Sequence, residues 1–81
     1  MELKDTIELM LSDDYNDRFR AEYYQLKKRL EKLEAMLVKW DKGELSFTPT
    51  CPRTIYGEQV QAMSDYCSVL IARAVMENVV L

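Results

Sequence analysis

Apolar side chains recur along the middle of the chain at alternating steps of four and three residues. The series is Phe19, Tyr23, Leu26, Leu30, Leu33, Leu37 and Trp40. Three seven-residue repeats of this kind place one apolar stripe along a single face of an α-helix. Asp13 or Asp14 can cap its start, and the triplet Asp41-Lys42-Gly43 supplies a stop. The pattern therefore predicts a helix over about 14–41.

The same rhythm returns in the C-terminal part of the chain. Its members are Tyr56, Val60, Met63, Cys67, Leu70 and Ala74. They predict a second helix, over about 53–78, that packs antiparallel to the first. Val69, Ile71 and Met76 lie beside this stripe, so the apolar face is wider than a contact between two helices requires. The surplus surface needs a further partner.

The first residues contain a third, shorter apolar pattern. Leu3, Ile7, Met10 and Leu11 fall on one helical face and predict a helix over about 2–12. This segment is one candidate to cover the surplus surface of the second long helix. A helix so short covers a hairpin only in part, so we expect the remaining apolar surface to meet other copies of the chain. The predicted fold is all-α: a short N-terminal helix plus an antiparallel two-helix hairpin, assembled as an oligomeric helical bundle.

The length of 81 residues indicates one helical domain, 1–81, with a thin core. A core of this size rarely supplies more than about 3–5 kcal/mol without disulfides, metal or oligomerisation. There is no histidine, and Cys51 and Cys67 lack the close spacing of a zinc site. If both cysteines lie on or at the start of one helix, they stand about 24 Å apart, too far for a disulfide. Self-association is therefore the expected source of added stability. The residues expected at that interface are Leu3, Ile7, Met10, Leu11, Val69, Ile71 and Met76.

Charge is unevenly distributed along the chain. Residues 1–17 carry one lysine and six carboxylates, whereas residues 18–32 carry six lysines or arginines and two glutamates. The overall charge of −3 argues against binding of duplex nucleic acid, but the basic segment can attract a small anion. The sequence contains no apolar run long enough for a membrane span and no basic signal start, so we expect no membrane association. The free thiols favour a cytoplasmic location.

Aromatic and basic residues of the first long helix are candidates for binding such an anion. Tyr15 and Tyr24 offer ring faces on which bases stack, and Lys27 and Lys28 offer ammonium groups for phosphates. Tyrosines in such places are more often half-buried or interface residues. Both interpretations stay open at the level of the sequence.

The stretch SFTPTCPRTIY, residues 46–56, is the second candidate. Both prolines lie in it, and a chain-reversing loop with a helix start explains them. Because a helix start presents unpaired N–H groups, Arg53 and Thr54 can also help to hold an anion there. No catalytic residue, metal or cofactor is expected, since the usual general base histidine is absent and neither cysteine has a clear activating partner.

Several motifs within residues 22–74 support a resemblance to a known family. They are the helix L-x-x-R/K-L-x-K-L-x-x-M-L-x-K-W-x-x-G, then C-P, then Q-x-x-A-M-x-x-Y, then L-x-x-R-A. In these motifs the chain resembles a family of small proteins from crAss-like gut phages and prophages. The resemblance implies a phage origin and residence in the host bacterial cytoplasm.

The order of the elements is also similar to that of the anti-CBASS sponges. These oligomeric phage proteins sequester cyclic oligonucleotide immune signals without degrading them, and a tyrosine and a lysine contact the ligand between protomers. The residues to which this resemblance assigns such roles are Tyr15 or Tyr24, Lys27 or Lys28 and, at a second phosphate site, Arg53 with Thr54. The resemblance predicts a non-enzymatic homo-oligomer that sequesters a cyclic di- or trinucleotide. The alternative is a helical interaction module that binds a host or phage protein.

Overall fold

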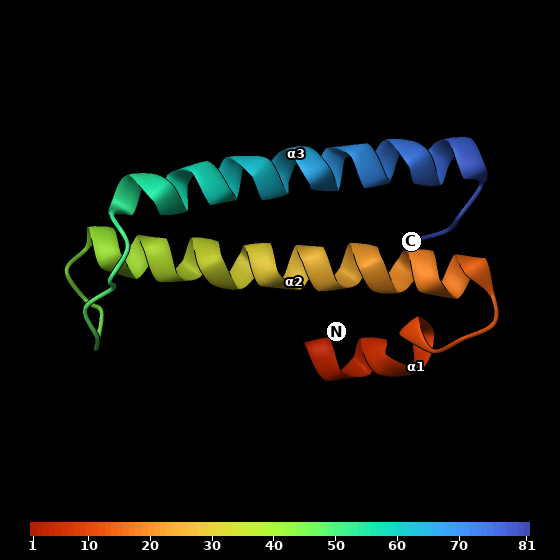
Figure 1. Ribbon diagram of the computed structural model, residues 1–81, viewed down its shortest axis with the longest axis horizontal. Coiled ribbons are helices and arrows are strands. Elements are labelled where there is room, and N and C mark those ends of the chain that lie inside the picture. The colour runs from red at the N-terminus through yellow and green to blue at the C-terminus, as the bar shows by residue number, and fades with distance from the viewer.

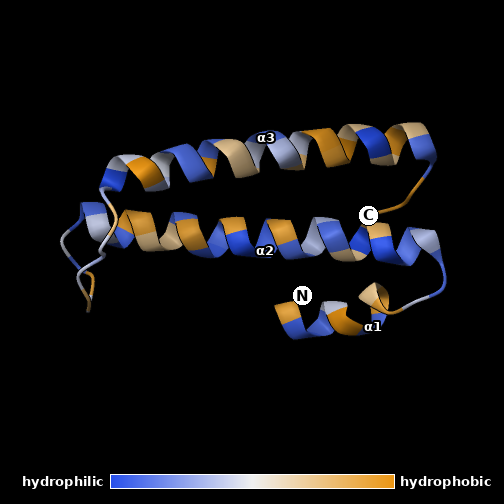
Figure 2. Cartoon of the chain, in the orientation of Figure 1, coloured by the Kyte–Doolittle hydropathy of each residue, from blue (hydrophilic) through white to orange (hydrophobic).

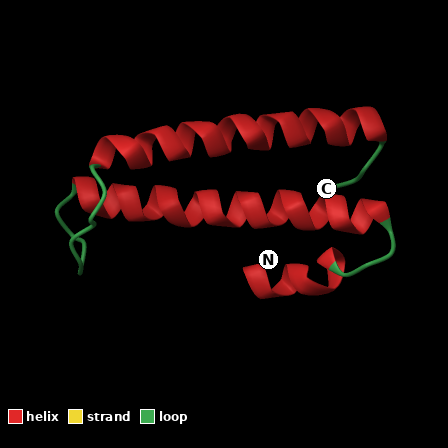
Figure 3. Cartoon of the chain, viewed as in Figure 1, coloured by secondary structure: helices red, strands yellow, loops and turns green.

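The protein is a hairpin of two long helices, with a short N-terminal segment packed on the first of them (Figure 1). The computed structural model describes all residues, 1–81. A 3₁₀ turn, η1 (Leu3–Thr6), runs into a short α1 (Ile7–Met10), and the long helices are α2 (Tyr15–Asp41) and α3 (Arg53–Glu77). Helices and loops are its only elements (Figure 3). The predicted all-α fold, with a short N-terminal helix and an antiparallel hairpin, is confirmed.

Local chemistry sets both ends of α2. At its start, Asp14 Oδ1 accepts a hydrogen bond from the backbone N–H of Asn16 at 2.9 Å, as an N-cap residue does. The helix stops after Asp41, because Gly43 adopts a φ of +72°, a left-handed conformation that residues with a Cβ rarely take. Both boundaries are readable in the sequence for this reason.

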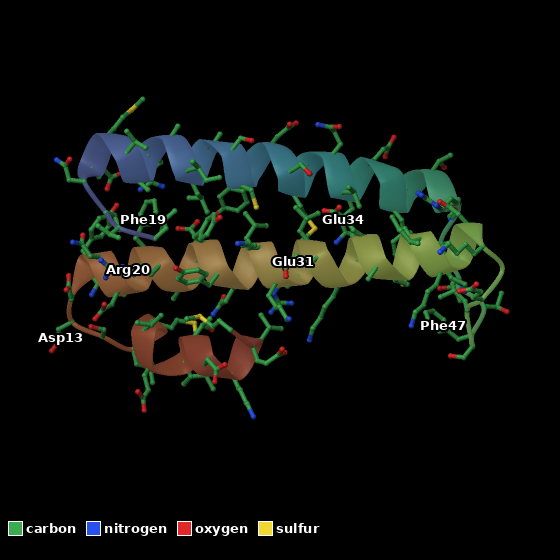
Figure 4. The ribbon with its side chains drawn as sticks, turned by 180° about the vertical axis from the view of Figure 1, so that it is seen from behind. Asp13, Phe19, Arg20, Glu31, Glu34 and Phe47 are labelled. Carbon is green, nitrogen blue, oxygen red and sulfur yellow. The ribbon has the colours of Figure 1, made fainter.

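The two predicted apolar stripes face each other and form the core. Leu70 of α3 is fully buried, and Phe19 of α2 is 2 % exposed. In Figure 4, Phe19 lies between the two long helices. The central cluster consists of Phe19, Leu26, Leu70, Ala74 and Val79, with Tyr23, Met63 and Cys67 packed against it. At the loop end the rings of Trp40 and Tyr56 meet edge to face, with centroids 5.6 Å apart.

Val79 is a core residue outside the predicted helices. Asn78 takes a left-handed conformation at the end of α3, with φ 57° and ψ 39°. This turns the chain so that the Val79 N–H donates to the Ala74 carbonyl at 2.9 Å, a helix-ending pattern that folds the next side chain back onto the helix. The Arg20 Nε donates to the Val80 carbonyl at 2.6 Å and holds this turn against α2.

The N-terminal segment packs differently from the sequence-based prediction. It is a 3₁₀ turn followed by one turn of α-helix instead of a continuous helix over 2–12. Because a 3₁₀ turn has three residues per turn, Leu3 and Thr6 share the inward face. Ile7 and Leu11, which the prediction placed on that face with Leu3, are 49 % and 76 % exposed.

A small hydrogen-bonded contact holds this segment on α2. Thr6 is 1 % exposed, its Oγ1 donates to the Leu3 carbonyl at 2.7 Å and it accepts from Gln25 Nε2 at 2.9 Å. Ala21 of α2 is equally buried, and its small side chain permits the close approach. Because the buried hydroxyl both donates and accepts, its burial leaves no hydrogen bond unmade, and the cost of removing it from water is offset.

The segment lies on α2, on the side opposite α3, so it does not cover the surplus apolar surface of α3 (Figure 1). The expectation that it would do so is wrong. Val69, Ile71 and Met76 remain 55 %, 47 % and 80 % exposed. Figure 2 shows hydrophobic colour recurring along α3 up to its C-terminal end.

The overall shape is extended for a chain of this length. The radius of gyration is 15.0 Å, against about 12 Å for a compact chain of equal length. The accessible surface is 5733 Å², against about 5,000 Å² for a compact monomer of this mass. A single seam between two helices therefore leaves more surface in water than a globular packing would.

The core position Leu70 provides a direct test of this arrangement. Replacing it by alanine (Leu70→Ala) leaves a cavity in the seam, so we expect the free energy of unfolding to fall by about 2–5 kcal/mol. Val75→Ala, at a side chain that is 74 % exposed, is the control and should change it by less than about 0.5 kcal/mol. Urea unfolding followed by circular dichroism measures both, and equal stability of the two variants would contradict the seam.

Candidate anion-binding site

Three of the predicted ligand residues come together on one flank of α2. Tyr24, Lys27 and Lys28 line a hollow of about 130 Å³ with Met1 and Glu31. Residues three and four apart share one side of a helix, which explains why Tyr24, Lys27 and Glu31 point the same way. Glu31 marks this flank on the side of α2 that faces the viewer in Figure 4.

Aromatic rings hold the first lysine of this flank. Tyr23 and Tyr24 pack edge to face, with ring centroids 5.3 Å apart. Lys27 Nζ lies 5.9 Å from the centroid of the Tyr23 ring, a distance at which the ring face attracts a cation. Lys27 forms no ion pair in this structure. Its ammonium group is therefore available to an incoming anion.

The second lysine already has an anionic partner. Lys28 Nζ lies 3.1 Å from Oε1 of Glu2, and Lys32 Nζ lies 3.8 Å from the other carboxylate oxygen, Oε2. The hydrogen bond and the charge of Lys28 hold the pKa of Glu2 below its ordinary value, and the charge of Lys32 adds to this. Two ammonium groups thus converge on one carboxylate next to the hollow.

Tyr15 lies away from this flank, at the open end of the hairpin. Its hydroxyl donates to Glu77 Oε1 at 2.5 Å and accepts from Arg73 Nη2 at 2.9 Å, while Arg73 Nε contacts Glu77 Oε2 at 3.0 Å. The hydrogen bond to Glu77 is the main reason that the pKa of Tyr15 is raised. This cluster joins the start of α2 to the end of α3.

Arg53 and Thr54 lie at the opposite end of the molecule. The Arg53 guanidinium contacts both carboxylate oxygens of Asp41, with Nε at 3.1 Å and Nη2 at 3.2 Å. Each partner stabilises the charge of the other, so the pKa of Asp41 is lowered and that of Arg53 is raised. The pair clamps the two ends of the loop between the long helices. Within one copy, the six predicted residues therefore fall in three separate places.

Groups that could perform chemistry are sparse. No set of three or more histidine, cysteine, aspartate or glutamate side chains is placed to hold a metal ion. Both cysteines are free, and burial raises the pKa of the Cys67 thiol, which disfavours the reactive thiolate. None of the helices combines the length and the apolar character of a membrane span.

These features define a class: a small helical hairpin whose longer helix carries an aromatic and lysine-rich flank under a short N-terminal segment. The sequence model of the Sequestin family matches residues 13–76. This range includes nearly all of α2 and α3, and the chain belongs to the Sequestin family. Comparison with curated proteins and with solved structures gave no match.

Two residues of the flank, Glu2 and Lys32, were not among the predicted site residues. The spacing of Lys28 and Lys32 by four residues is a signal that the sequence does contain, since it places both side chains on one side of α2. The position of Glu2 is not readable in the sequence, because it depends on the packing of the N-terminal segment 26 residues away.

The cluster at the open end predicts how stability depends on pH. Hydrogen bonds from Tyr15 and Arg73 hold the pKa of Glu77 below its ordinary value of 4.5. A lowered folded-state pKa gives a stabilising contribution that is complete above pH 4.5 and is lost as the pH falls through that lower pKa. Glu77→Gln should therefore lower the melting temperature at pH 7, and its difference from the wild type should shrink below pH 4.5 and vanish once the pH lies below the lowered pKa. Glu58→Gln, an exposed carboxylate without an ion pair, is the control. A difference that persists in acid would contradict the assignment.

Proposed function

We propose that this protein binds and holds a small anionic nucleotide signal without converting it, and that the ligand is a cyclic di- or trinucleotide. The name of its family, Sequestin, suggests sequestration and supports this proposal. The resemblance of the sequence to phage proteins adds a location to this proposal. The protein would act in the cytoplasm of a bacterial host, where removal of the signal would prevent an immune response.

The observation that carries the proposal is the convergence of Tyr24, Lys27 and Lys28 around one hollow. A cyclic nucleotide offers flat bases and phosphate charges. Stacking of a base on an aromatic ring contributes about 1–3 kcal/mol, and lysine ammonium groups bind phosphates as point charges. Holding a ligand in this way requires affinity and no reactive group, which fits the small number of groups suited to chemistry.

The size of the hollow favours a site shared between copies. Its volume is about 130 Å³, whereas ligand pockets usually measure about 300–1,000 Å³. One copy therefore contacts only part of a cyclic dinucleotide. Two copies related by a two-fold axis would present two Tyr24 rings and two Lys27–Lys28 pairs, which matches a ligand with two bases and two phosphates.

A ligand panel tests this function. A bound ligand at about 100 times its Kd stabilises the fold by about 2.7 kcal/mol, so one class of cyclic nucleotide should raise the melting temperature. Tyr24→Ala and Lys27→Gln should remove the shift. Tyr66→Ala and Lys42→Gln, exposed residues away from the hollow, should retain it. Chromatography after denaturation should return the nucleotide intact. Conversion of the ligand, or no shift with any nucleotide, would overturn the proposal.

The exposed side of α3 supports self-association as the means of building that shared site. Val69 and Met76 lie on one flank of α3 and Ile71 on the other, and neither α2 nor the N-terminal segment covers these apolar side chains. Because the shape is extended and the core is thin, burial of further apolar surface against a second copy would increase the stability of the fold. Of the four predicted interface residues of the N-terminal segment, Ile7, Met10 and Leu11 are exposed as well, whereas Leu3 is half-buried.

Light scattering tests the assembly. We expect an oligomer at low micromolar concentration and a monomer after the double substitution Val69→Glu and Met76→Glu, because two carboxylates cannot be buried in an apolar contact without partners. Val38→Glu, an exposed apolar site on α2, is the control and should leave the assembly intact. A well-folded wild-type monomer at that concentration would contradict the assembly. It would favour the alternative function, a module that binds a different protein through the same side of α3.

A further inference from the structure

The carboxylate of Glu2 occupies a place that suits a phosphate. We propose that Lys28 and Lys32 form the phosphate subsite of this protein, and that Glu2 fills the subsite until the ligand displaces it. This inference rests on the proposed function, since it names which groups receive the phosphate. It adds Lys32 as a binding residue and gives the N-terminal segment the role of an internal competitor.

The geometry of Glu2, Lys28 and Lys32 supports the replacement of the Glu2 carboxylate by a phosphate group. Lys28 and Lys32 contact different oxygens of a single carboxylate, at 3.1 Å and 3.8 Å. They stand four residues apart on α2, so their side chains remain on the same side of the helix whether or not Glu2 is present. A phosphate group has the same oxygen acceptors and at least as much negative charge. Two converging ammonium groups therefore hold it at least as well.

The subsite adjoins the hollow. Lys28 belongs to both: it contacts Glu2, and it lines the hollow with Tyr24. A nucleotide phosphate between Lys28 and Lys32 thus lies within reach of a base that stacks on Tyr24. Met1 also lines the hollow, so the residue next to Glu2 forms part of the wall that limits its size. Displacement of Glu2 frees the lysines and enlarges the hollow in one movement.

Glu2 can leave without unfolding the segment behind it. Its carboxylate is about half exposed, and exposed ion pairs are weak. The segment is anchored separately by buried Thr6, which is hydrogen-bonded to Gln25 of α2. The Glu2 N–H also donates to Asp5 Oδ2 at 2.8 Å, so the movement is confined to the Glu2 side chain and to Met1, ahead of these anchors.

Two substitutions with matched controls test the inference. Glu2→Gln removes the competing charge, so the Kd of the nucleotide should fall by about two- to fivefold, the range given by an exposed ion pair. Glu8→Gln, which removes an exposed carboxylate with no ion pair, should leave the Kd unchanged. Lys32→Gln should raise the Kd at least twofold, and Lys42→Gln, an exposed lysine with no ion pair, should not. The gain from Glu2→Gln should disappear when Lys32→Gln is also present, because the two residues act on the same subsite.

A second measurement separates this inference from the proposed function. Inorganic pyrophosphate, added to the full chain, should shift the backbone NMR signals of residues 2–6 and 24–32, and the signals of residues 2–6 in Glu2→Gln should already lie nearer their displaced positions. If pyrophosphate acts in this way and no nucleotide binds, the proposed function is wrong and the subsite stands. If a nucleotide binds and Glu2→Gln and Lys32→Gln behave as their controls do, the function stands and the subsite is wrong. Weaker nucleotide binding by Glu2→Gln would also overturn the inference.

Discussion

The packing of α2 against α3 is the contact on which the rest of the molecule depends. Leu70 and Ala74 of α3 are buried against Phe19 and Leu26 of α2, and this single seam contains most of the apolar burial in the chain. Because each helix alone would be only marginally stable in water, the seam also keeps the side chains of α2 in fixed positions. The flank that carries Tyr24 and Lys27 exists as an ordered surface only because the neighbouring side of α2 is packed against α3.

The surface of α2 has three parts with different surroundings. One side faces α3, a second side receives the N-terminal segment at Ala21 and Gln25, and the flank between them remains open. The charge distribution follows the same division, since the acidic first residues lie beside the basic part of α2. The ion pair of Glu2 with Lys28 is one contact between the acidic segment and the basic part of α2. Under the proposed function, the acidic segment would compete with the anionic ligand for this flank and would so set the affinity.

Polar clusters at the two ends of the hairpin fix the alignment of the helices. Asp41 with Arg53 closes the loop end, and Tyr15 with Glu77 closes the open end together with Arg73. These groups are exposed or half-buried, and pairs so close to solvent add little stability. Their effect is on geometry: they hold the register in which the apolar residues of the seam meet. The aromatic and cationic residues at these ends are therefore engaged in hydrogen bonds and ion pairs, whereas Lys27 on the open flank contacts the Tyr23 ring and forms no ion pair.

The sequence by itself determined what depends on neighbouring residues: the two long helices, the apolar stripes that face each other, and the ends of α2 at Asp14 and Gly43. Helix periodicity and capping act over a few residues, so they can be read locally. The grouping of Tyr24 with the two lysines was readable for the same reason. Only the tertiary structure decided that the first turn is a 3₁₀ helix docked through Thr6, that Tyr15 and Arg53 belong to end clamps, and that Glu2 reaches Lys28 and Lys32. Each of these features joins residues that are distant along the chain. Their positions follow from which surfaces the folded hairpin brings together, and no local pattern encodes that.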